Sequence, residues 1–296
     1  YTYVSRRIYT HRLRSIGRKD HIIIAVSDLE AATRDYARML GRDPSWRGRH
    51  PDYGSANTLF VLDNTYLELL AAEGSGWAGD RVTQHIADKG QGLMGLVFGV
   101  DEIGPFIDRA RKAGLDISDP LTGHGTDLAE TDERSWQNMV WPEDAARGIF
   151  SFAIRHDDPD ALKPAPVTGA GPCTGVDHVV VQTSDIDASK NFYGTQLGIR
   201  LALEQSRPDW GGDMLFFRTN HMSIEVIGSS KYDARLDHLW GLALKTDDIE
   251  ATHARLVENS VAVSEVREGR KPGTRVCTVK SHCLDVPTLL VQHLSS

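Results

Sequence analysis

The feature that most constrains this chain is an internal repeat. Residues 20–40 read DHIIIAVSDLEAATRDYARML, and residues 177–197 read DHVVVQTSDIDASKNFYGTQL. Both segments open with Asp-His, continue with a β-branched run and a Ser-Asp pair, and end in an amphipathic stretch. Self-similarity of this kind indicates a duplicated structural unit. The chain is therefore predicted to contain two copies of one domain.

The two copies also repeat a histidine and a glutamate at one fixed spacing. In the first copy, Glu68 lies 47 residues after His21. In the second copy, Glu225 lies 47 residues after His178. Each histidine precedes a short apolar run that suits a buried strand, and each glutamate lies within another strand-like run. We therefore expect an imidazole and a carboxylate to recur together in both halves.

A shorter repeat lies inside each copy. The segments at 95–115 and 241–261 follow the same order of strand, acidic turn and helix as residues 21–41. Hairpin signals follow the first helix of each copy, as two strand-like runs around a turn. The turns of these hairpins are Asp63-Asn64 and Thr219-Asn220. The chain thus divides into four units of roughly 50–60 residues, each with the order β-α-β-β-β.

The ends of the first helix of each copy are marked by capping residues. Ser27 and Ser184 stand where an N-cap is expected, and Glu30 completes a capping box with Ser27. Gly41 and Gly198 lie just beyond the apolar periodicity, and we expect them to end the helices.

The repeat sets the fold class and the domain boundaries. The fold class is α+β, with four βαβββ modules paired into two domains. The predicted parts are a basic N-terminal arm at 1–19, a first domain at 20–156 (modules 20–75 and 92–156), a linker at 157–174, and a second domain at 175–296 (modules 175–230 and 237–296). The linker is rich in Pro, Gly, Ala and Asp and has no apolar period.

The basic arm carries no predicted chemistry. It contains five Arg, one Lys and one His, and no acidic residue. Three interpretations stay open: a segment outside the native start, an arm that packs on a partner subunit, or part of an Arg-rich targeting segment.

Composition narrows the class of protein. The net charge is −8, from 33 basic and 41 acidic residues, which argues against a general nucleic-acid binder. No apolar run approaches the ~18–20 residues that span a bilayer. Three cysteines, Cys173, Cys277 and Cys283, are too few for a disulfide framework. We expect a reducing, cytoplasmic setting.

Tandem β-α-β-β-β units with a histidine in the first strand and a glutamate in the last resemble the vicinal oxygen chelate superfamily. That superfamily includes glyoxalase I, type I extradiol dioxygenases, fosfomycin-resistance proteins and bleomycin-binding proteins. The stretch GRHPDYGSANTLFVLDNTYLELLA at 48–71 is most similar to the glyoxalase-like domain family. The resemblance covers about residues 20–156 and 175–295. It implies two domains whose mixed sheets form open cups, but it does not imply one activity, because one fold hosts many reactions.

The resemblance also implies metal-ligand positions on the first and last strands of each unit. His21 and Glu68 match these positions in the first domain, as do His178 and Glu225 in the second. The second unit of each domain departs from the pattern. There the expected positions hold Gly95 and Ala153 in the first domain and Gly241 and Leu290 in the second. Each domain thus supplies one imidazole and one carboxylate.

Other side chains are candidates for completing a ligand set. Gln292 shares strand parity with Leu290, so we expect both to face one side, and Arg155 is the counterpart of Gln292 in the first domain. A glutamine can complete a site, whereas an arginine cannot. His238 joins the cup only if the strand register shifts. The second domain is therefore slightly favoured, with His178, Glu225 and Gln292 as its ligands.

Two loops carry side chains suited to an oxygen-rich or aromatic anion. In the first domain, residues 45–57 combine Trp, Arg, His and Asn side chains. The matching loop of the second domain is EQSRPDWGGD. The predicted substrate-binding residues are Arg49, His50, Asn57, Arg155, Trp210 and His238.

Three hypotheses for the function follow. The first is a metal-dependent lyase or isomerase that chelates vicinal oxygens or a carbonyl at a divalent ion, with Zn, Mn, Ni or Fe as candidates. The second is a metal-free protein that binds and sequesters a small molecule. The third is an extradiol-type dioxygenase, ranked lower because the second units lack ligands. The absence of a P-loop and of a GxGxxG after a strand indicates no nucleotide cofactor. The expected partner is a small molecule, without nucleic acid or membrane, bound by a monomer or homodimer.

Overall fold

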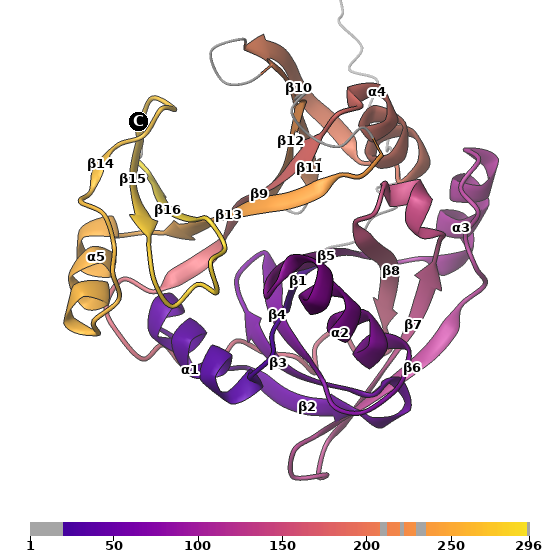
Figure 1. Ribbon diagram of the computed structural model, residues 1–296, viewed down its shortest axis with the longest axis horizontal. Helices are drawn as coiled ribbons and strands as arrows, with labels where there is room; N and C mark the ends of the chain where they lie inside the picture. The colour runs from indigo at the N-terminus through magenta and orange to yellow at the C-terminus, as the bar shows by residue number, and fades with distance from the viewer. Residues whose placement is uncertain (1–19, 208–211, 220–221, 229–234, 295–296) are drawn as a thin grey trace, which may run out of the picture.

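The computed structural model has the four β-α-β-β-β units in the predicted order (Figure 1), and it describes residues 20–207, 212–219, 222–228 and 235–294. The first unit contains β1 (Asp20–Ala25), α1 (Leu29–Leu40), β2 (Trp46–His50), β3 (Ser55–Val61) and β4 (Thr65–Ala72). Helix α2 (Trp77–Lys89) leads to the second unit, which contains β5 (Gly92–Gly99), α3 (Ile103–Lys112), β6 (Leu121–Asp127), β7 (Glu133–Val140) and β8 (Phe150–His156).

The second domain repeats this order. Its first unit contains β9 (Cys173–Thr183), α4 (Ile186–Ser189) with a following helical turn at Lys190–Gln196, β10 (Arg200–Arg207), β11 (Gly212–Thr219) and β12 (Met222–Gly228). Its second unit contains β13 (His238–Thr246), α5 (Ile249–Glu258), β14 (Arg267–Glu268), β15 (Thr274–Val279) and β16 (Thr288–His293). Strand β9 begins inside the segment that the sequence assigns to the linker.

The helix ends follow the predicted signals with one correction. The N-caps are Asp28 and Asp185 rather than the preceding serines Ser27 and Ser184. Each aspartate accepts a hydrogen bond at 2.9 Å from the backbone N–H three residues ahead, so its carboxylate satisfies an otherwise unpaired donor. Gly41 ends α1 with a φ of 68°, as predicted.

The sheet of the first domain closes into a barrel with the strand order β1-β4-β3-β2-β6-β7-β8-β5. The sequence predicts an open cup, and the difference is the pairing of β2 with β6 at Gly48 and Arg49. A Cβ atom at Gly48 would lie 2.4 Å from the carbonyl oxygen of Thr126, so this close approach requires glycine. Closure turns the concave face of the sheet into an enclosed interior.

The sheet of the second domain stays open, as predicted. Its strand order is β10-β11-β12-β9-β13-β16-β15-β14, with β10 and β14 at the edges. Figure 1 shows this sheet beside the barrel, with its two halves spread apart.

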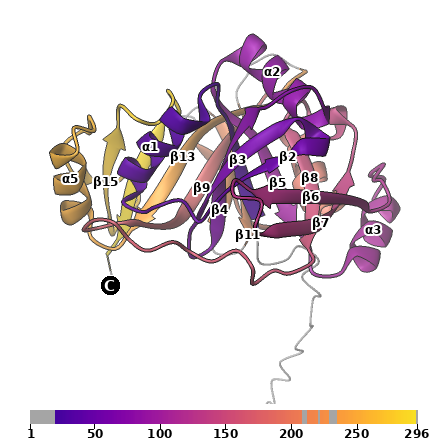
Figure 2. The same cartoon turned by 90° about the horizontal axis from the view of Figure 1, so that it is seen from below.

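The helices of the two domains meet in pairs at the domain interface. Helix α1 lies next to the C-terminal unit, and α3 lies next to the helical turn after α4 (Figures 1 and 2). The ring centroids of Trp141 and Phe192 are 5.9 Å apart, and those of Phe98 and Tyr193 are 6.5 Å apart. One apolar cluster therefore runs through both domains. Across the described residues, no helix is long and apolar enough to cross a membrane.

One buried arginine joins three segments at this interface. Arg255 of α5 is 6% exposed. Its guanidinium donates to the carbonyl oxygens of Ala170 at 2.8 Å and of Met39 and Gly171 at 3.2 Å, and also to that of Arg38. These bonds tie the linker and α1 to α5.

We expect Arg255→Met to destabilise the protein by about 2–4 kcal/mol, because several buried carbonyl groups lose their donor. The melting temperature measured by calorimetry should fall by about 5–10 °C. Arg49→Met is the matched control, because Arg49 is exposed and pairs with Glu73 on the surface. An equal loss of stability in both variants would contradict this role of Arg255.

Candidate functional site

The predicted histidine and glutamate of the first domain meet inside the barrel. Along β1, Ile22 and Ile24 join the cluster packed under the helices, so His21 and Ile23 face the interior. Strand β4 runs parallel to β1 and pairs Glu68 with Ile23. The Nε2 of His21 and the Oε2 of Glu68 are 3.3 Å apart, and both side chains are buried.

The carboxylate of Glu68 stays ionised in this interior. Burial acts to raise its pKa, but the hydrogen bond and charge of His21 outweigh burial, with help from His50 and Asn57. The pKa of Glu68 falls to about 2. The barrel therefore encloses a negative charge that its neighbours compensate.

A chain of polar contacts extends from Glu68 across the barrel. The Nδ2 of Asn57 donates to Glu68 Oε1 at 2.7 Å and lies 3.3 Å from His50 Nε2. The other ring nitrogen of His50 is 3.0 Å from Ser55 Oγ. Burial lowers the pKa of His50, so its imidazole is neutral near pH 7. The sequence predicted His50 and Asn57 as site residues, and the structure places both beside the His21–Glu68 pair.

These side chains line a cavity of about 70 Å³ whose other walls are aromatic and apolar. Tyr66 stacks on His21 with the ring centroids 4.4 Å apart. Trp136 meets His50 edge to face at 5.4 Å. Further walls come from Tyr53, Leu59, Leu70, Trp77, Phe150, Phe152 and Ile154. The cavity combines an ionised carboxylate with apolar walls that limit its contact with water.

A cation and a further histidine also line the cavity. Arg134 of β7 lies over the ring of Trp46, 5.3 Å from its centroid. The guanidinium of Arg134 is 3.4 Å from His156 Nδ1, and His156 Nε2 is 3.3 Å from the hydroxyl of Tyr66. Arg134 is suited to an anionic ligand group, because guanidinium and carboxylate form charge-assisted hydrogen bonds.

The second unit offers no ligand at the positions equivalent to His21 and Glu68. Glu68 pairs with Ile23, two residues after His21, and Phe152 pairs with Val97, two residues after Gly95. The position equivalent to Glu68 is thus Phe152 rather than Ala153. By the same comparison, the second domain has Leu289 there rather than Leu290, because Leu289 pairs with Ala243.

This shift of one residue reverses the predicted strand faces. Arg155 is exposed and does not line the cavity. Gln292 lies at the start of α5, where its side chain accepts from Ile249 N at 3.2 Å and donates to Asp247 O at 2.6 Å. The prediction that Gln292 joins His178 and Glu225 is therefore wrong, because side chains one residue apart in a strand face opposite sides.

The histidines that follow Arg155 and Gln292 lie on the opposite faces of their strands from these two residues. His156 lines the first cavity, and His293 Nε2 is 2.6 Å from Asp177 Oδ2. The signal was present in the sequence as the matching endings IRH and VQH. The strand register shows that His156 is the inward member of the first ending, whereas the exposed His293 pairs with Asp177.

The second domain also brings its predicted pair together. The Nε2 of His178 is 3.5 Å from Glu225 Oε2, and its Nδ1 is 2.9 Å from Asp177 Oδ1. Burial acts to raise the pKa of Asp177, but hydrogen bonds to His178 and His293 lower it. Burial raises the pKa of Glu225. These side chains lie on an open sheet, so their environment differs from that of the first pair.

The remaining predicted site residues lie elsewhere. Arg49 pairs with Glu73 at 3.0 Å on the surface. His238 is at the start of β13, five residues from Ala243, the pairing partner of His178. The prediction for Trp210 lies outside the described residues.

The first site supplies part of a ligand set for a divalent ion. His21 Nε2 and Glu68 Oε2 are close enough for both to bind one ion with bonds of about 2 Å. The Oδ1 of Asn57 is buried without a hydrogen-bond partner among the described residues and is a third, neutral donor. Across the described part of the chain, no three His, Cys, Asp or Glu side chains form a metal-binding group. His21, Glu68 and Asn57 would supply one nitrogen and two oxygen donors to such an ion.

We expect a fall in pH to lower the free energy of unfolding of the wild-type protein more than that of the Glu68→Gln variant. The depressed pKa of Glu68 stabilises the fold above its unfolded value of 4.5, and this stability is lost as pH falls through about 2. Between pH 6 and pH 3 the loss is on the order of 2 kcal/mol. Urea unfolding at pH 6 and pH 3 measures it. Equal acid sensitivity of the two proteins would show that Glu68 is not held ionised.

Two family models match the chain. One described as "Glyoxalase-like domain" matches residues 20–171, and one described as "Glyoxalase/Bleomycin resistance protein/Dioxygenase superfamily" matches residues 177–278. The ethylmalonyl-CoA/methylmalonyl-CoA epimerase of Cereibacter sphaeroides is 36% identical over 116 residues, which are 37% of this chain and 84% of the epimerase.

Solved structures agree on the fold. A hypothetical protein from Staphylococcus aureus has a TM-score of 0.64 at 12% identity, over 92% of this chain and 98% of its own. A mutant of 4-hydroxymandelate synthase from Streptomyces coelicolor has a TM-score of 0.63 at 14% identity, over 93% of each chain. At these identities the likeness concerns the fold alone. Because the first family model spans 152 of the 296 residues, the chain belongs to the glyoxalase-like domain family of the vicinal oxygen chelate superfamily.

Proposed function

We propose that this protein is an isomerase or lyase that acts on a small, oxygen-rich carboxylate in the cavity of the first domain. The observation that carries the proposal is the buried pair of His21 and Glu68, 3.3 Å apart, in a cavity that Arg134 also lines. A relative named as an epimerase supports the reaction class. The first domain, rather than the second, is the proposed active domain.

The side chains of the cavity suit proton transfer next to a carbonyl group. Arg134 and His156 orient a carboxylate of the substrate at one end. His50 is neutral, so it is able to accept a proton from a carbon atom beside the carbonyl. The aromatic walls exclude water, which strengthens the electrostatic contacts inside.

A divalent ion would be held by His21 and Glu68, with Asn57 as a weaker donor. When bound, it supplies Lewis-acid stabilisation of the negative charge that develops on the substrate oxygens. Zn, Mn, Ni and Fe are the candidates for a mixed nitrogen and oxygen donor set. A dioxygenase is ranked lower because Phe152 and Gly95 occupy the remaining ligand positions. A cytoplasmic location stays a prediction.

We expect protein purified without chelator to take up about one Mn²⁺ or Zn²⁺ per chain, measured by elemental mass spectrometry. His21→Ala/Glu68→Ala should lose the ion and also lose exchange of the acidic C–H proton of methylmalonyl-CoA in D₂O, followed by NMR. The matched control is His178→Ala/Glu225→Ala, which should retain both properties. Loss in the control alone would place the active site in the second domain.

A second candidate is a metal-free protein that sequesters a small anion. This candidate is favoured by Phe152, an apolar residue at the position where the superfamily pattern expects a metal ligand. In that case the chain takes up no metal after reconstitution and catalyses no proton exchange, yet it still binds methylmalonate.

We expect Arg134→Ala to weaken binding of methylmalonate about tenfold or more, measured by calorimetry, because a charge-assisted hydrogen bond is lost. Arg134→Lys should recover part of the affinity, since it keeps the charge but loses the planar fork. Arg49→Ala is the control and should bind normally. An unchanged affinity in Arg134→Ala would contradict the proposed orientation of the substrate.

A further inference from the structure

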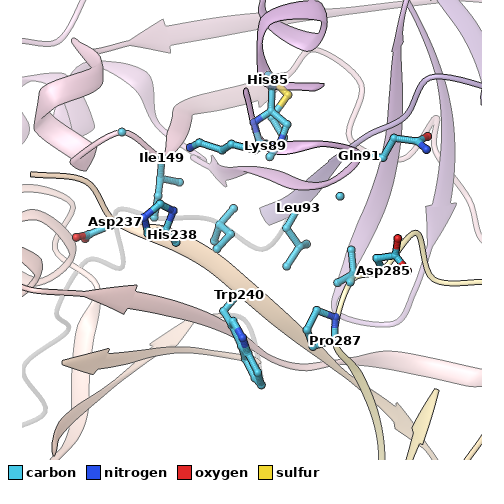
Figure 3. Close-up of a pocket in the computed structure, with 15 residues that line it drawn as sticks. His85, Lys89, Gln91, Leu93, Ile149, Asp237, His238, Trp240, Asp285 and Pro287 are labelled. Atoms are coloured by element: carbon cyan, nitrogen blue, oxygen red, sulfur yellow. The ribbon is translucent and has the colours of Figure 1, made fainter. Parts of the chain in front are cut away.

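A larger cavity, of about 220 Å³, lies between the two domains. Figure 3 shows His85 and Lys89 of α2 on one side of it, Trp240 and Pro287 on the other, and Leu93 between them. Because the lining residues come from both domains, this cavity exists only when the domains are packed together.

Several residues that line the cavity occupy equivalent positions in the two copies of the internal repeat. Residues 91–94 lead into Gly95, and residues 237–240 lead into the equivalent Gly241; both segments line the cavity. Ile149 precedes Phe152 by three residues, as Val286 precedes Leu289, and both also line it. Equivalent strand ends thus face each other across the cavity and give it an apolar floor.

His85 and Lys89 line the cavity from the first domain, whereas Asp237, His238 and Asp285 line it from the second. His85 and Lys89 are four residues apart, on one face of α2. Burial, together with the charge of Lys89, lowers the pKa of His85 to about 4, so Lys89 is the cation present near pH 7. Among the described residues, Lys89 forms no ion pair. The buried Asp237 is already paired with Arg147 at 2.9 Å.

Gln91 adds a further donor at the edge of the cavity. Its Oε1 accepts from Ser27 N at 2.9 Å, which fixes the side chain and leaves its amide N–H groups for a ligand. Asp285 is the other acidic residue of the lining, and it lies on the far side from Lys89 in Figure 3. Figure 3 shows Gln91 and Lys89 on different sides of the cavity, so Lys89 and His85 are the nitrogen-bearing side chains at the end formed by α2.

We propose that this interdomain cavity is a second ligand site, which takes a small organic anion with a flat apolar body. The anionic group binds Lys89, with His85 beside it. The apolar body packs among Leu93, Leu239 and Pro287. This site is independent of the reaction proposed for the first-domain cavity, because none of these residues lines that cavity.

The test uses 4-fluorophenylacetate as the probe and measures its affinity for the full chain by ¹⁹F NMR titration. Lys89→Ala should weaken binding about tenfold, because the charge-assisted contact is lost. Lys89→Arg should retain most of the affinity. Lys112→Ala is the matched control, since Lys112 is an exposed lysine at the end of α3, and it should bind as the wild type does.

Two further measurements separate this site from the first cavity. Arg134→Ala, which removes the cation proposed to bind a carboxylate in the first cavity, should bind the probe normally. By contrast, 4-fluorophenethylamine, which carries the opposite charge, should bind the wild type at least tenfold more weakly than the anion. Unchanged binding in Lys89→Ala, or binding lost in Arg134→Ala, would overturn the proposal.

Discussion

The interaction on which the rest depends is the buried contact between an imidazole and a carboxylate inside the first barrel. An ionised carboxylate in an apolar interior is costly unless charged and hydrogen-bonding partners compensate it. His21 and Asn57 contact the two oxygens of Glu68 directly, and this compensation keeps the carboxylate ionised. A charge held in this way is available to act on a ligand, and the apolar walls around it make that action stronger.

The two halves of the duplicated chain place the same pair in different surroundings. In the first half, pairing of β2 with β6 closes the sheet, and the His21–Glu68 pair lines a cavity. In the second half the sheet is open, and His178 is shared between Glu225 and Asp177. Both copies thus keep the pair and the fold, whereas closure of the sheet gives the two pairs different surroundings.

The repeat predicted the fold and the two pairs, because a β-branched strand, a capped helix and a fixed spacing are local patterns. The faces of β8 and β16 were predicted wrongly, because an error of one residue in aligning the strands turns every side chain to the opposite side. That error placed Arg155 and Gln292 where His156 and His293 lie. Closure of the barrel could not be predicted either, since it depends on a contact between Gly48 and β6, far apart in sequence.

The most direct test of this account is anomalous diffraction from a crystal of the full chain grown with Mn²⁺. The account predicts one anomalous peak within about 2.3 Å of both His21 Nε2 and Glu68 Oε2, with none between His178 and Glu225. A peak at the second pair alone would show that the active site lies in the second domain and would contradict the account. The absence of any peak would leave only the metal-free binding function.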